Sequence, residues 1–465
     1  TPYKHDMPLT DDMIDTVLRY NVNDVEETER FIDIIRPQIE FREALGSEWI
    51  NYNDTKIGKQ TFIRELESAG VECFERAPDT NRRRPRQTAR ERGIQVQDIL
   101  IDVPFETRDL QRVKQAFRDL TIYPWETKKA FEFEAVCGDL TLHFGTGGIH
   151  GSVSGHTVRA ERGTSITDLD VTSYYPSLAI QWGFYPAHLG QQFVEVYAAL
   201  KERRVSYPKG SPENAMLKLA LNGVYGDSNN PYSPFYDPAY TMAITINGQM
   251  LLAWLAEMLA PYCDLIQVNT DGLTIASHAD PTLVDRIDEI CMDWERRSRM
   301  TLERADYAGM WIRDVNNYIA LTTDGKVKRK GAYDWDRDWH QDHSALVIPR
   351  AVEAHLLNAY PVDDFLLHHR DRFDFMCHVK VPRNSRLELS GNEVQGTGRF
   401  YVSSTGGKLT KVMPPLKGRD NERHIDIMKG WALTECNDAR DFDWNTLERY
   451  WYYLEALKLV KGVGA

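Results

Sequence analysis

The spacing of apolar residues predicts helices at both ends of the chain. In residues 8–45, apolar side chains recur three and four positions apart behind an acidic start, which is typical of an amphipathic helix. Residues 46–160 show no single period. From about residue 340 onward the pattern again favours helices, and residues 444–459 form the last amphipathic segment. The C-terminal part is therefore expected to be largely helical.

The middle of the chain changes from a strand pattern to a helix pattern. Residues 166–171 alternate between apolar and polar side chains, and a helix is expected from Tyr174, because Pro176 is tolerated in a first helical turn. Two amphipathic helices follow. A turn at residues 207–210 separates them, and the second helix is expected to have Ser211 as its cap, Pro212 as its first position and an end near Tyr225. Helices joined by so short a turn form an antiparallel pair.

One long helix, residues 240–259, precedes two expected β-hairpins. Short apolar runs around a tight turn are typical of such hairpins. The paired strands are residues 265–268 with 273–276, and residues 318–321 with 326–330.

Length and charge narrow the class of protein. A chain of 465 residues is too long for one compact core, so several domains are expected. The formal net charge of −13 argues against a nucleic-acid partner unless basic residues cluster. Two clusters exist, at residues 81–92 and 326–330. For the first, a solvated surface is the favoured interpretation, because charged runs usually face water.

The sequence predicts a soluble protein of the cytoplasm without a membrane partner. No N-terminal segment resembles a signal peptide, and the apolar stretch at residues 250–259 is short and interrupted by Glu257. Six cysteines are scattered without a C-x-x-C pair or a zinc-like spacing, which favours reduced, structural thiols.

Two aspartates are candidates for metal chemistry. Asp170 ends a strand, and Asp271 lies at the tip of a hairpin about a hundred residues later. Carboxylates from neighbouring strands suit Mg²⁺, and two such ions can activate an attacking oxygen and stabilise a leaving pyrophosphate. Each aspartate alone is also explained as a turn or cap residue, because Asp-Gly is common in hairpins.

The second of the two short helices carries a polar stripe. Lys218, Asn222 and Tyr225 share one face at helical spacing. A lysine there can hold phosphate oxygens, and a tyrosine at the helix end can flank a base pair. A solvated polar stripe explains the same pattern equally well.

Three motifs in the right order carry a resemblance to the family B DNA polymerases. The stretch 170–177 (DVTSYYPS) resembles their motif A, 218–226 (KLALNGVYG) resembles motif B, and 269–272 (NTDG) resembles motif C. The match covers residues 140 to 335. The resemblance implies an α+β fold shaped as a right hand, with an antiparallel palm, short two-helix fingers and a helical thumb.

The resemblance also implies site residues. Asp170, Asp271 and the Val171 carbonyl would hold two Mg²⁺ ions, for which Mn²⁺ is a possible substitute. Tyr175 would select deoxyribose. The expected nucleotide-binding residues are Arg203, Lys218, Asn222, Tyr225, Ser173, Tyr174 and Tyr175, and the expected DNA-binding residues are Gly147, Gly148, Thr270, Lys328, Lys330 and Gly331.

Two departures from the family pattern limit what the resemblance implies. The first acid of motif C is replaced by Asn269, which leaves the metal geometry open. Tyr20 and Asp24 resemble the third motif of a proofreading exonuclease, but the other two motifs are absent. Residues 1–45 are therefore interpreted as an exonuclease remnant, and 3′–5′ exonuclease activity is not expected from this chain alone.

The resulting hypothesis is a template-directed DNA polymerase of bacteriophage type that extends a nucleic-acid primer with deoxynucleotides. Its partners would be primer-template DNA and dNTPs, with an upstream exonuclease segment or phage replication proteins as further candidates. A non-catalytic, polymerase-like DNA-binding subunit and a nuclease with a vestigial polymerase half are the alternatives. The expected domains are an exonuclease remnant at 1–45, a template-side region at 46–165, palm at 166–180 and 227–335, fingers at 181–226 and thumb at 336–465.

Overall fold

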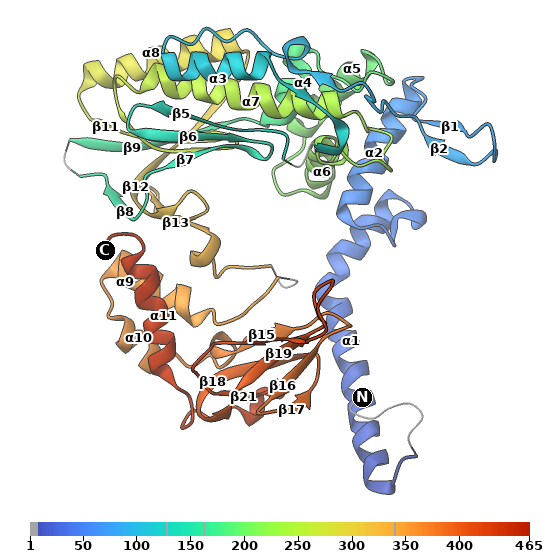
Figure 1. Cartoon of the computed structure of the whole chain (residues 1–465), viewed down its shortest axis with the longest axis vertical. Helices are drawn as coiled ribbons and strands as arrows, with labels where there is room; N and C mark the ends of the chain where they lie inside the picture. The colour runs from blue at the N-terminus through green and yellow to red at the C-terminus, as the bar shows by residue number, and fades with distance from the viewer. Residues whose placement is uncertain (1–7, 127–128, 162, 339–340) are drawn as a thin grey trace. The chain divides into compact units, whose positions relative to one another are not determined.

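The structure is a computed structural model that describes residues 8–126, 129–161, 163–338 and 341–465 (Figure 1). It contains helices and antiparallel sheets, as an α+β protein does. The chain divides into two compact units. The first comprises Thr1–Ile94, Thr121–Trp125 and Tyr175–Ile244, and the second comprises Gln95–Leu120, Glu126–Tyr174 and Thr245–Ala465.

Helices dominate the first unit, and aromatic rings form its centre. The ring of Phe62 contacts those of Phe193, Tyr197 and Phe235 at centroid distances between 5.2 and 5.6 Å. The elements are α1 (Asp11–Leu45), η1 (Ser47–Trp49), α2 (Asp54–Ser68), β1 (Phe74–Arg76), β2 (Arg83–Pro85), β3 (Ile94–Gln95), β4 (Thr121–Ile122), α4 (Tyr174–Trp182), α5 (Gln192–Val205) and α6 (Pro212–Asp227).

The close approach of α2 to α6 depends on a glycine. A Cβ atom on Gly58 would lie 2.6 Å from the backbone carbonyl carbon of Leu219, which is nearer than side chains come to a neighbouring backbone. Beside this contact, Lys59 and Asp227 form an ion pair at 2.5 Å. Residues before the sequence motifs thus help to hold α6 in place.

The predicted antiparallel pair of helices, α5 and α6, is confirmed. The Tyr197 hydroxyl donates to the Leu221 carbonyl at 2.5 Å, which joins the two helices through a buried side chain. Helix α6 begins as expected, because the Ser211 hydroxyl accepts a hydrogen bond from the Asn214 amide, as an N-cap does.

One buried carboxylate connects distant parts of the first unit. Asp237 is fully buried and accepts two hydrogen bonds at 2.8 Å from the Arg90 guanidinium. It also accepts from the backbone amides of Ala187 and Ala239, at 2.9 and 3.0 Å. All of its strong acceptor sites are therefore used, as a buried charge requires.

The second unit is built on an antiparallel sheet of ten strands within the described residues. Residues directly opposite one another on paired strands share a face, so the register decides which side chains meet. In spatial order the strands are β14 (Val327–Lys330), β13 (Asn317–Thr322), β12 (Leu302–Asp314), β9 (Thr164–Val171), β11 (Gly272–His278), β10 (Asp264–Asn269), β7 (Gly148–Ser152), β6 (Leu140–Gly145) and β5 (Glu132–Cys137), with β8 (His156–Arg159) paired to β12.

Helices α3 (Arg108–Arg118), α7 (Pro238–Leu259) and α8 (Pro281–Ser298) lie over one face of this sheet (Figure 1). The indole of Trp294 in α8 donates to the Leu251 carbonyl of α7 at 2.9 Å. Short 3₁₀ turns connect other elements: η2 (Val96–Asp98), η3 (Pro124–Glu126), η4 (Gly331–Tyr333), η5 (Phe373–Phe375) and η6 (Ala439–Asp441).

Among the described residues, α7 is the one helix that is long and apolar enough to cross a membrane. However, 94% of its most apolar 18-residue window is buried inside the protein. It also carries buried polar side chains with specific partners. Glu257 accepts from the amide and hydroxyl of Thr107, and Asn247 bonds the backbone of Ile99 and Ile101. These contacts identify α7 as a core helix.

The expectation of a largely helical C-terminal part is wrong. Helices α9 (Val347–Asn358), α10 (Val362–His368) and α11 (Arg449–Lys461) pack around a core that includes Phe375 and Tyr452. Between α10 and α11 the chain forms two small antiparallel sheets, ordered β15-β18-β21 and β17-β16-β19-β20. Their strands are β15 (Cys377–Lys380), β16 (Arg386–Leu389), β17 (Asn392–Val394), β18 (Thr397–Gly407), β19 (Leu409–Met413), β20 (Arg423–Asp426) and β21 (Leu433–Glu435).

Replacing Asp237 tests whether its buried hydrogen bonds stabilise the first unit. Asp237→Ala leaves Arg90 and two backbone amides without their acceptor, so we expect a loss of about 3 kcal/mol in the free energy of unfolding. Glu65→Gln, which breaks a solvent-exposed ion pair with Arg203 in the same unit, is the control and should cost less than ~1 kcal/mol. Urea denaturation of both variants gives the two values, and equal losses would contradict the role assigned to Asp237.

Candidate active site

Sheet register brings the two candidate aspartates together. Asp170 lies near the end of β9, directly opposite Gly272 at the start of β11, and Asp271 precedes Gly272 in the β10–β11 turn. The Val171 amide donates to the Asp271 carbonyl at 2.8 Å, which joins the end of β9 to that turn. Residues a hundred positions apart thus become neighbours through strand pairing.

Gly272 allows this approach. A Cβ atom there would collide with Oδ1 of Asp170 and lie 2.7 Å from the Leu169 carbonyl oxygen. The Asp170 carboxylate therefore occupies the space that any other residue at position 272 would fill. The glycine of the NTDG turn has a local structural reason as well as a place in the resemblance.

Both carboxylates open into a pocket of about 270 Å³ on the sheet, which we call the acidic pocket. Acids, amides and two lysines line it together. The lining residues are Asp168, Asp170, Gln267, Asn269, Asp271, Gly272, Leu273, Thr274, Tyr318, Lys328 and Lys330.

The acidic pocket has the electrostatics of a cation site. Solvent reaches Asp170 at the mouth, yet partial burial and the nearby Asp168 carboxylate raise its pKa to about 6, with Asp271 adding to the effect and Lys328 opposing it. Within the described residues, neither Asp170 nor Asp271 forms an ion pair with a basic side chain. A cation between them would relieve their mutual repulsion.

The oxygen donors present fit Mg²⁺. No group of three or more His, Cys, Asp or Glu side chains is placed to hold a metal in the described part of the chain. Two carboxylates with backbone carbonyls are nevertheless enough for Mg²⁺, which keeps much of its coordination sphere for water and phosphate oxygens. Asp170, Asp271 and the Val171 carbonyl are the residues that would hold it.

The pocket contains residues that the sequence patterns did not single out. Asp168 precedes Asp170 by two positions, so strand periodicity alone places it on the same face. Gln267 is 4% exposed, and its Oε1 accepts no hydrogen bond within the described residues. Thr274 and Tyr318 gave no local signal, because only the fold brings them here.

The lysines expected to contact the primer line the same pocket. Lys328 and Lys330 alternate along β14 with Arg329, so they share one face of the strand. Gly331 has a structural role, since its φ of +61° and its contact with the Asn317 side chain exclude other residues. The position of Gly331 therefore needs no DNA contact to explain it.

The turn that carries Asp271 is fixed by a neighbouring hairpin. The Thr270 amide donates to the Ile149 carbonyl at 3.0 Å, and the Thr270 hydroxyl lies 3.2 Å from Asn269 Oδ1 and 3.3 Å from His150 Nε2. Gly148 has a φ of +137°, and a Cβ atom there would make a tight contact of 3.1 Å with the Thr270 hydroxyl oxygen. Gly148 at the start of β7 thus packs against the turn that carries Asp271, while Gly147 lies in the two-residue turn between β6 and β7.

The expected nucleotide-binding residues divide between the two units. In the second unit, Ser173 adopts a left-handed backbone (φ +48°), and the buried Tyr174 donates its hydroxyl to the Gly248 carbonyl at 2.6 Å. Tyr174 is therefore a core residue that offers only its backbone. Its neighbour Tyr175 begins the next segment of the first unit.

In the first unit, two aromatic rings meet, one from the stretch that resembles motif A and one from the stretch that resembles motif B. Tyr175 and Tyr225 lie with ring centroids 4.2 Å apart at an interplanar angle of 35°. Lys218 and Asn222 are exposed on α6 while the apolar face of that helix is buried, as the spacing predicted. Arg203 of α5 forms an ion pair with Glu65 at 2.7 Å, which a phosphate ligand would have to replace.

Tyr20 and Asp24, the expected exonuclease remnant, are exposed on α1, four positions apart. This spacing places them on the same side of the helix. Within the described residues they lie in no group of metal-binding side chains.

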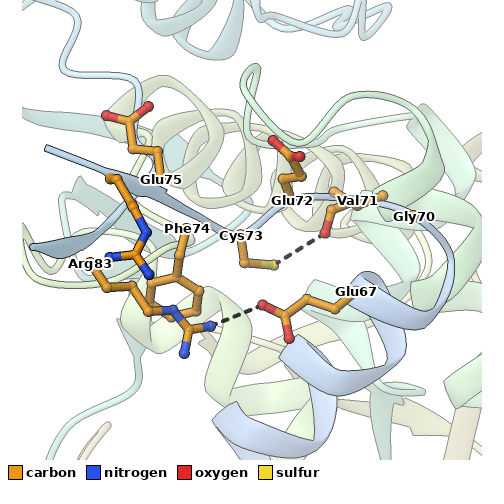
Figure 2. Close-up of a pocket in the computed structure, with 9 residues that line it drawn as sticks. Glu67, Gly70, Val71, Glu72, Cys73, Phe74, Glu75 and Arg83 are labelled. Carbon is orange, nitrogen blue, oxygen red and sulfur yellow. Dashed lines mark hydrogen bonds and ion pairs between the residues drawn. The ribbon is translucent and has the colours of Figure 1, made fainter. Parts of the chain in front are cut away.

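Most of the basic segment 81–92 is neutralised locally. Figure 2 shows Arg83 directed at Glu67 beside a hollow of about 740 Å³ at the end of α2. Arg84, Arg86 and Arg90 pair with Glu75, Glu72 and Asp237. The buried Cys73 thiol in this hollow is unreactive at neutral pH, because desolvation raises its pKa to about 12. Apart from Arg90, whose partner Asp237 is buried, these contacts agree with the favoured interpretation of a solvated surface.

Comparisons with known proteins give a likeness of fold but no match in sequence. No family model matches the chain, and no curated protein matches it in sequence. The structure is similar to that of the family B DNA polymerase from the hyperthermophilic archaeon Pyrobaculum calidifontis, with a TM-score of 0.43 and 12% identity. The match covers 98% of this chain and 57% of the archaeal one.

A substitution at Gly272 tests the geometry of the carboxylates. Gly272→Ala places a methyl group against Asp170. We therefore expect the affinity for Mn²⁺ to fall by about tenfold and the free energy of unfolding to fall by about 1–3 kcal/mol. Gly396→Ala, where the new Cβ would make an ordinary 3.4 Å contact with Val381, is the matched control. Isothermal titration with Mn²⁺ and thermal unfolding measure both effects; unchanged Mn²⁺ affinity in Gly272→Ala would show that Asp170 is not confined by this glycine.

Proposed function

We propose that this chain is a template-directed DNA polymerase of the family B, bacteriophage type, which extends a primer with deoxynucleotides. The observation that supports it most directly is the acidic pocket, where Asp170 and Asp271 lie beside Lys328 and Lys330. This is the combination that phosphoryl transfer onto a nucleic-acid end requires: carboxylates for cations and ammonium groups for backbone phosphates.

The proposed assignment of regions follows from the motifs. The ten-stranded sheet would serve as the palm, α5 and α6 as the fingers, and the part from residue 336 as the thumb, which here contains two small sheets as well as helices. Primer-template DNA, dNTPs and two Mg²⁺ ions are the proposed ligands.

Each site residue has a proposed task. When bound, the two Mg²⁺ ions would lower the pKa of the primer hydroxyl and stabilise the charge on the leaving pyrophosphate. Asp170 and Asp271 would fix the reacting groups relative to the sheet, because strand pairing fixes both backbones. Lys218 on α6 would bind triphosphate oxygens as a point charge, and Lys328 and Lys330 would hold primer phosphates.

Tyr175 would select the sugar. Its ring packs against Tyr225, so its position is restricted by a second aromatic side chain. A ring held against the C2′ side of a bound nucleotide leaves no space for a hydroxyl, and discrimination then arises from repulsion of the wrong substrate.

Removal of either aspartate tests the polymerase proposal. Asp170→Asn and Asp271→Asn should each lower primer extension at least about a hundredfold, equivalent to ~2.7 kcal/mol. Primer-template binding should persist, since the phosphate contacts would come from lysines such as Lys328 and Lys330, which these substitutions leave in place. Asp264→Asn, on the exposed start of β10, is the control and should extend normally.

Extension is measured with Mg²⁺ and four deoxynucleotides. A variant at position 170 or 271 that kept a tenth of the wild-type rate would exclude that residue from the site. Wild-type protein that binds primer-template without extending it would identify the non-catalytic DNA-binding alternative instead.

Sugar selection gives an independent test. Tyr175→Ala should raise kcat/KM for ribonucleotides relative to deoxynucleotides by about a hundredfold, if the clash is worth ~3 kcal/mol. Tyr175→Phe keeps the ring and should leave the ratio unchanged. Single-nucleotide incorporation with both sugars measures the ratio, and an unaltered ratio in a folded, active Tyr175→Ala protein would remove Tyr175 from the sugar site.

A further inference from the structure

The side chain of Asp168 has no task in the proposed reaction, although it lies in the acidic pocket. It is 7% exposed and accepts hydrogen bonds from the Thr274 hydroxyl at 2.6 Å and the Tyr307 hydroxyl at 2.5 Å. The Lys328 ammonium donates to it at 3.2 Å. Three donors from three other strands converge on one buried carboxylate, which is the arrangement that makes burial of a charge tolerable.

Lys328, Asp168 and Tyr307 form a closed triangle, because the Lys328 ammonium also donates to the Tyr307 hydroxyl at 3.2 Å. Lys328 is on β14, at the edge of the sheet, whereas Asp168 is on β9 and Tyr307 is on β12 between them in the strand order. A lysine side chain has four rotatable bonds and many conformers when it is unrestrained. Here two partners fix the position of its terminal nitrogen.

The backbone of Lys328 is held separately, from the other face of β14. The neighbouring Arg329 forms two hydrogen bonds with Glu353 of α9, at 2.5 and 2.7 Å. Its guanidinium lies 4.2 Å from the centre of the Trp335 ring, and Arg350 lies 4.1 Å from the same ring centre. The strand is thus anchored without Asp168, and Asp168 affects mainly the direction of the lysine side chain.

Asp170 competes for the same ammonium. It follows Asp168 by two positions on β9, so both carboxylates share a face and line one pocket with Lys328. If Lys328 lost its contact with Asp168, Asp170 would be the next carboxylate within reach. An ammonium paired with Asp170 would then oppose binding of a cation there and would withdraw from the primer strand.

We propose that Asp168, with Tyr307, is a positioning residue that holds the Lys328 ammonium away from Asp170 and available for a backbone phosphate of the primer strand. This inference rests on the proposed polymerase function, because it assigns Lys328 to the primer and Asp170 to the metal. It adds a second carboxylate of β9 to the site, one that acts through a lysine and does not itself ligate metal.

A double-mutant cycle between positions 168 and 328 tests the proposal without catalysis. The proteins are wild type, Asp168→Asn, Lys328→Met and the double variant, and the readout is the affinity for Mn²⁺ alone, measured by electron paramagnetic resonance. Asn retains an acceptor for Thr274 and removes the charge. We expect Asp168→Asn to weaken Mn²⁺ binding by about tenfold in the presence of Lys328 and by less than about twofold in the Lys328→Met background, since contacting residues show coupling of this size.

An equal or larger loss in the Lys328→Met background would overturn the proposal, because Asp168 would then act as a ligand or through its charge alone. Tyr307→Phe provides a second route if Asp168→Asn fails to fold: it should weaken Mn²⁺ binding only when Lys328 is present. Asp306→Asn is the matched control, since Asp306 is an exposed acid next to Tyr307 on β12 and its carboxylate accepts a hydrogen bond from the Thr167 hydroxyl, outside the acidic pocket. It should leave Mn²⁺ affinity unchanged.

Primer-template affinity in Ca²⁺, measured by fluorescence anisotropy, gives the second readout. Asp168→Asn and Lys328→Met should each weaken it by about fivefold, and the double variant should be no weaker than Lys328→Met alone. Additive losses would contradict positioning through Lys328. Neither measurement needs nucleotide incorporation. Failure of the wild-type protein to extend primers would therefore refute the proposed function, whereas the double-mutant cycle would still show whether Asp168 positions Lys328.

Discussion

The antiparallel pairing of β9 with β11 is the contact on which the candidate site depends. It sets Asp170 opposite Gly272, and the turn before Gly272 then delivers Asp271 to the same end of the sheet. A slip of one residue would turn Asp170 to the other face and separate the two carboxylates. The missing side chain at position 272 provides the space for the Asp170 carboxylate, so register and glycine act together.

The strands on either side of β9 and β11 carry the remaining residues of the acidic pocket. On one side, β12 and β13 bring Tyr307 and Tyr318 toward the pocket, and β14 adds Lys328 and Lys330. On the other side, β10 and β7 support the NTDG turn through the contact between Thr270 and the backbone of Ile149. Strands therefore fix four of the charged side chains of the pocket, Asp168, Asp170, Lys328 and Lys330, and the turn between β10 and β11 carries the fifth, Asp271.

Sequence reasoning succeeded where the signal is local. The strand before Asp170, the turn at residues 269–272 and the cap at Ser211 each depend on a few adjacent residues, and each is found as predicted. It failed for the C-terminal part, where all strands from β15 to β21 except β18 have five residues or fewer, and where β15 and β16 each pair with a strand that is not the next in sequence. Tyr307 joined the site without any sequence signal, because only the pairing of β12 with β9 places it beside Asp168.

The charge balance of the pocket explains why Asn269 is compatible with it. Asp168, Asp170 and Asp271 already supply three carboxylates, of which one is paired with Lys328. A fourth acid at position 269, on the same pocket, would add repulsion in a partly buried space and raise the cost of ionising Asp170 further. An amide keeps an oxygen acceptor for the Thr270 hydroxyl without adding charge. Asn269 and the acid two residues before Asp170 are thus parts of one electrostatic arrangement: position 269 contributes a neutral side chain, and Asp168 contributes a carboxylate whose charge is balanced by Lys328.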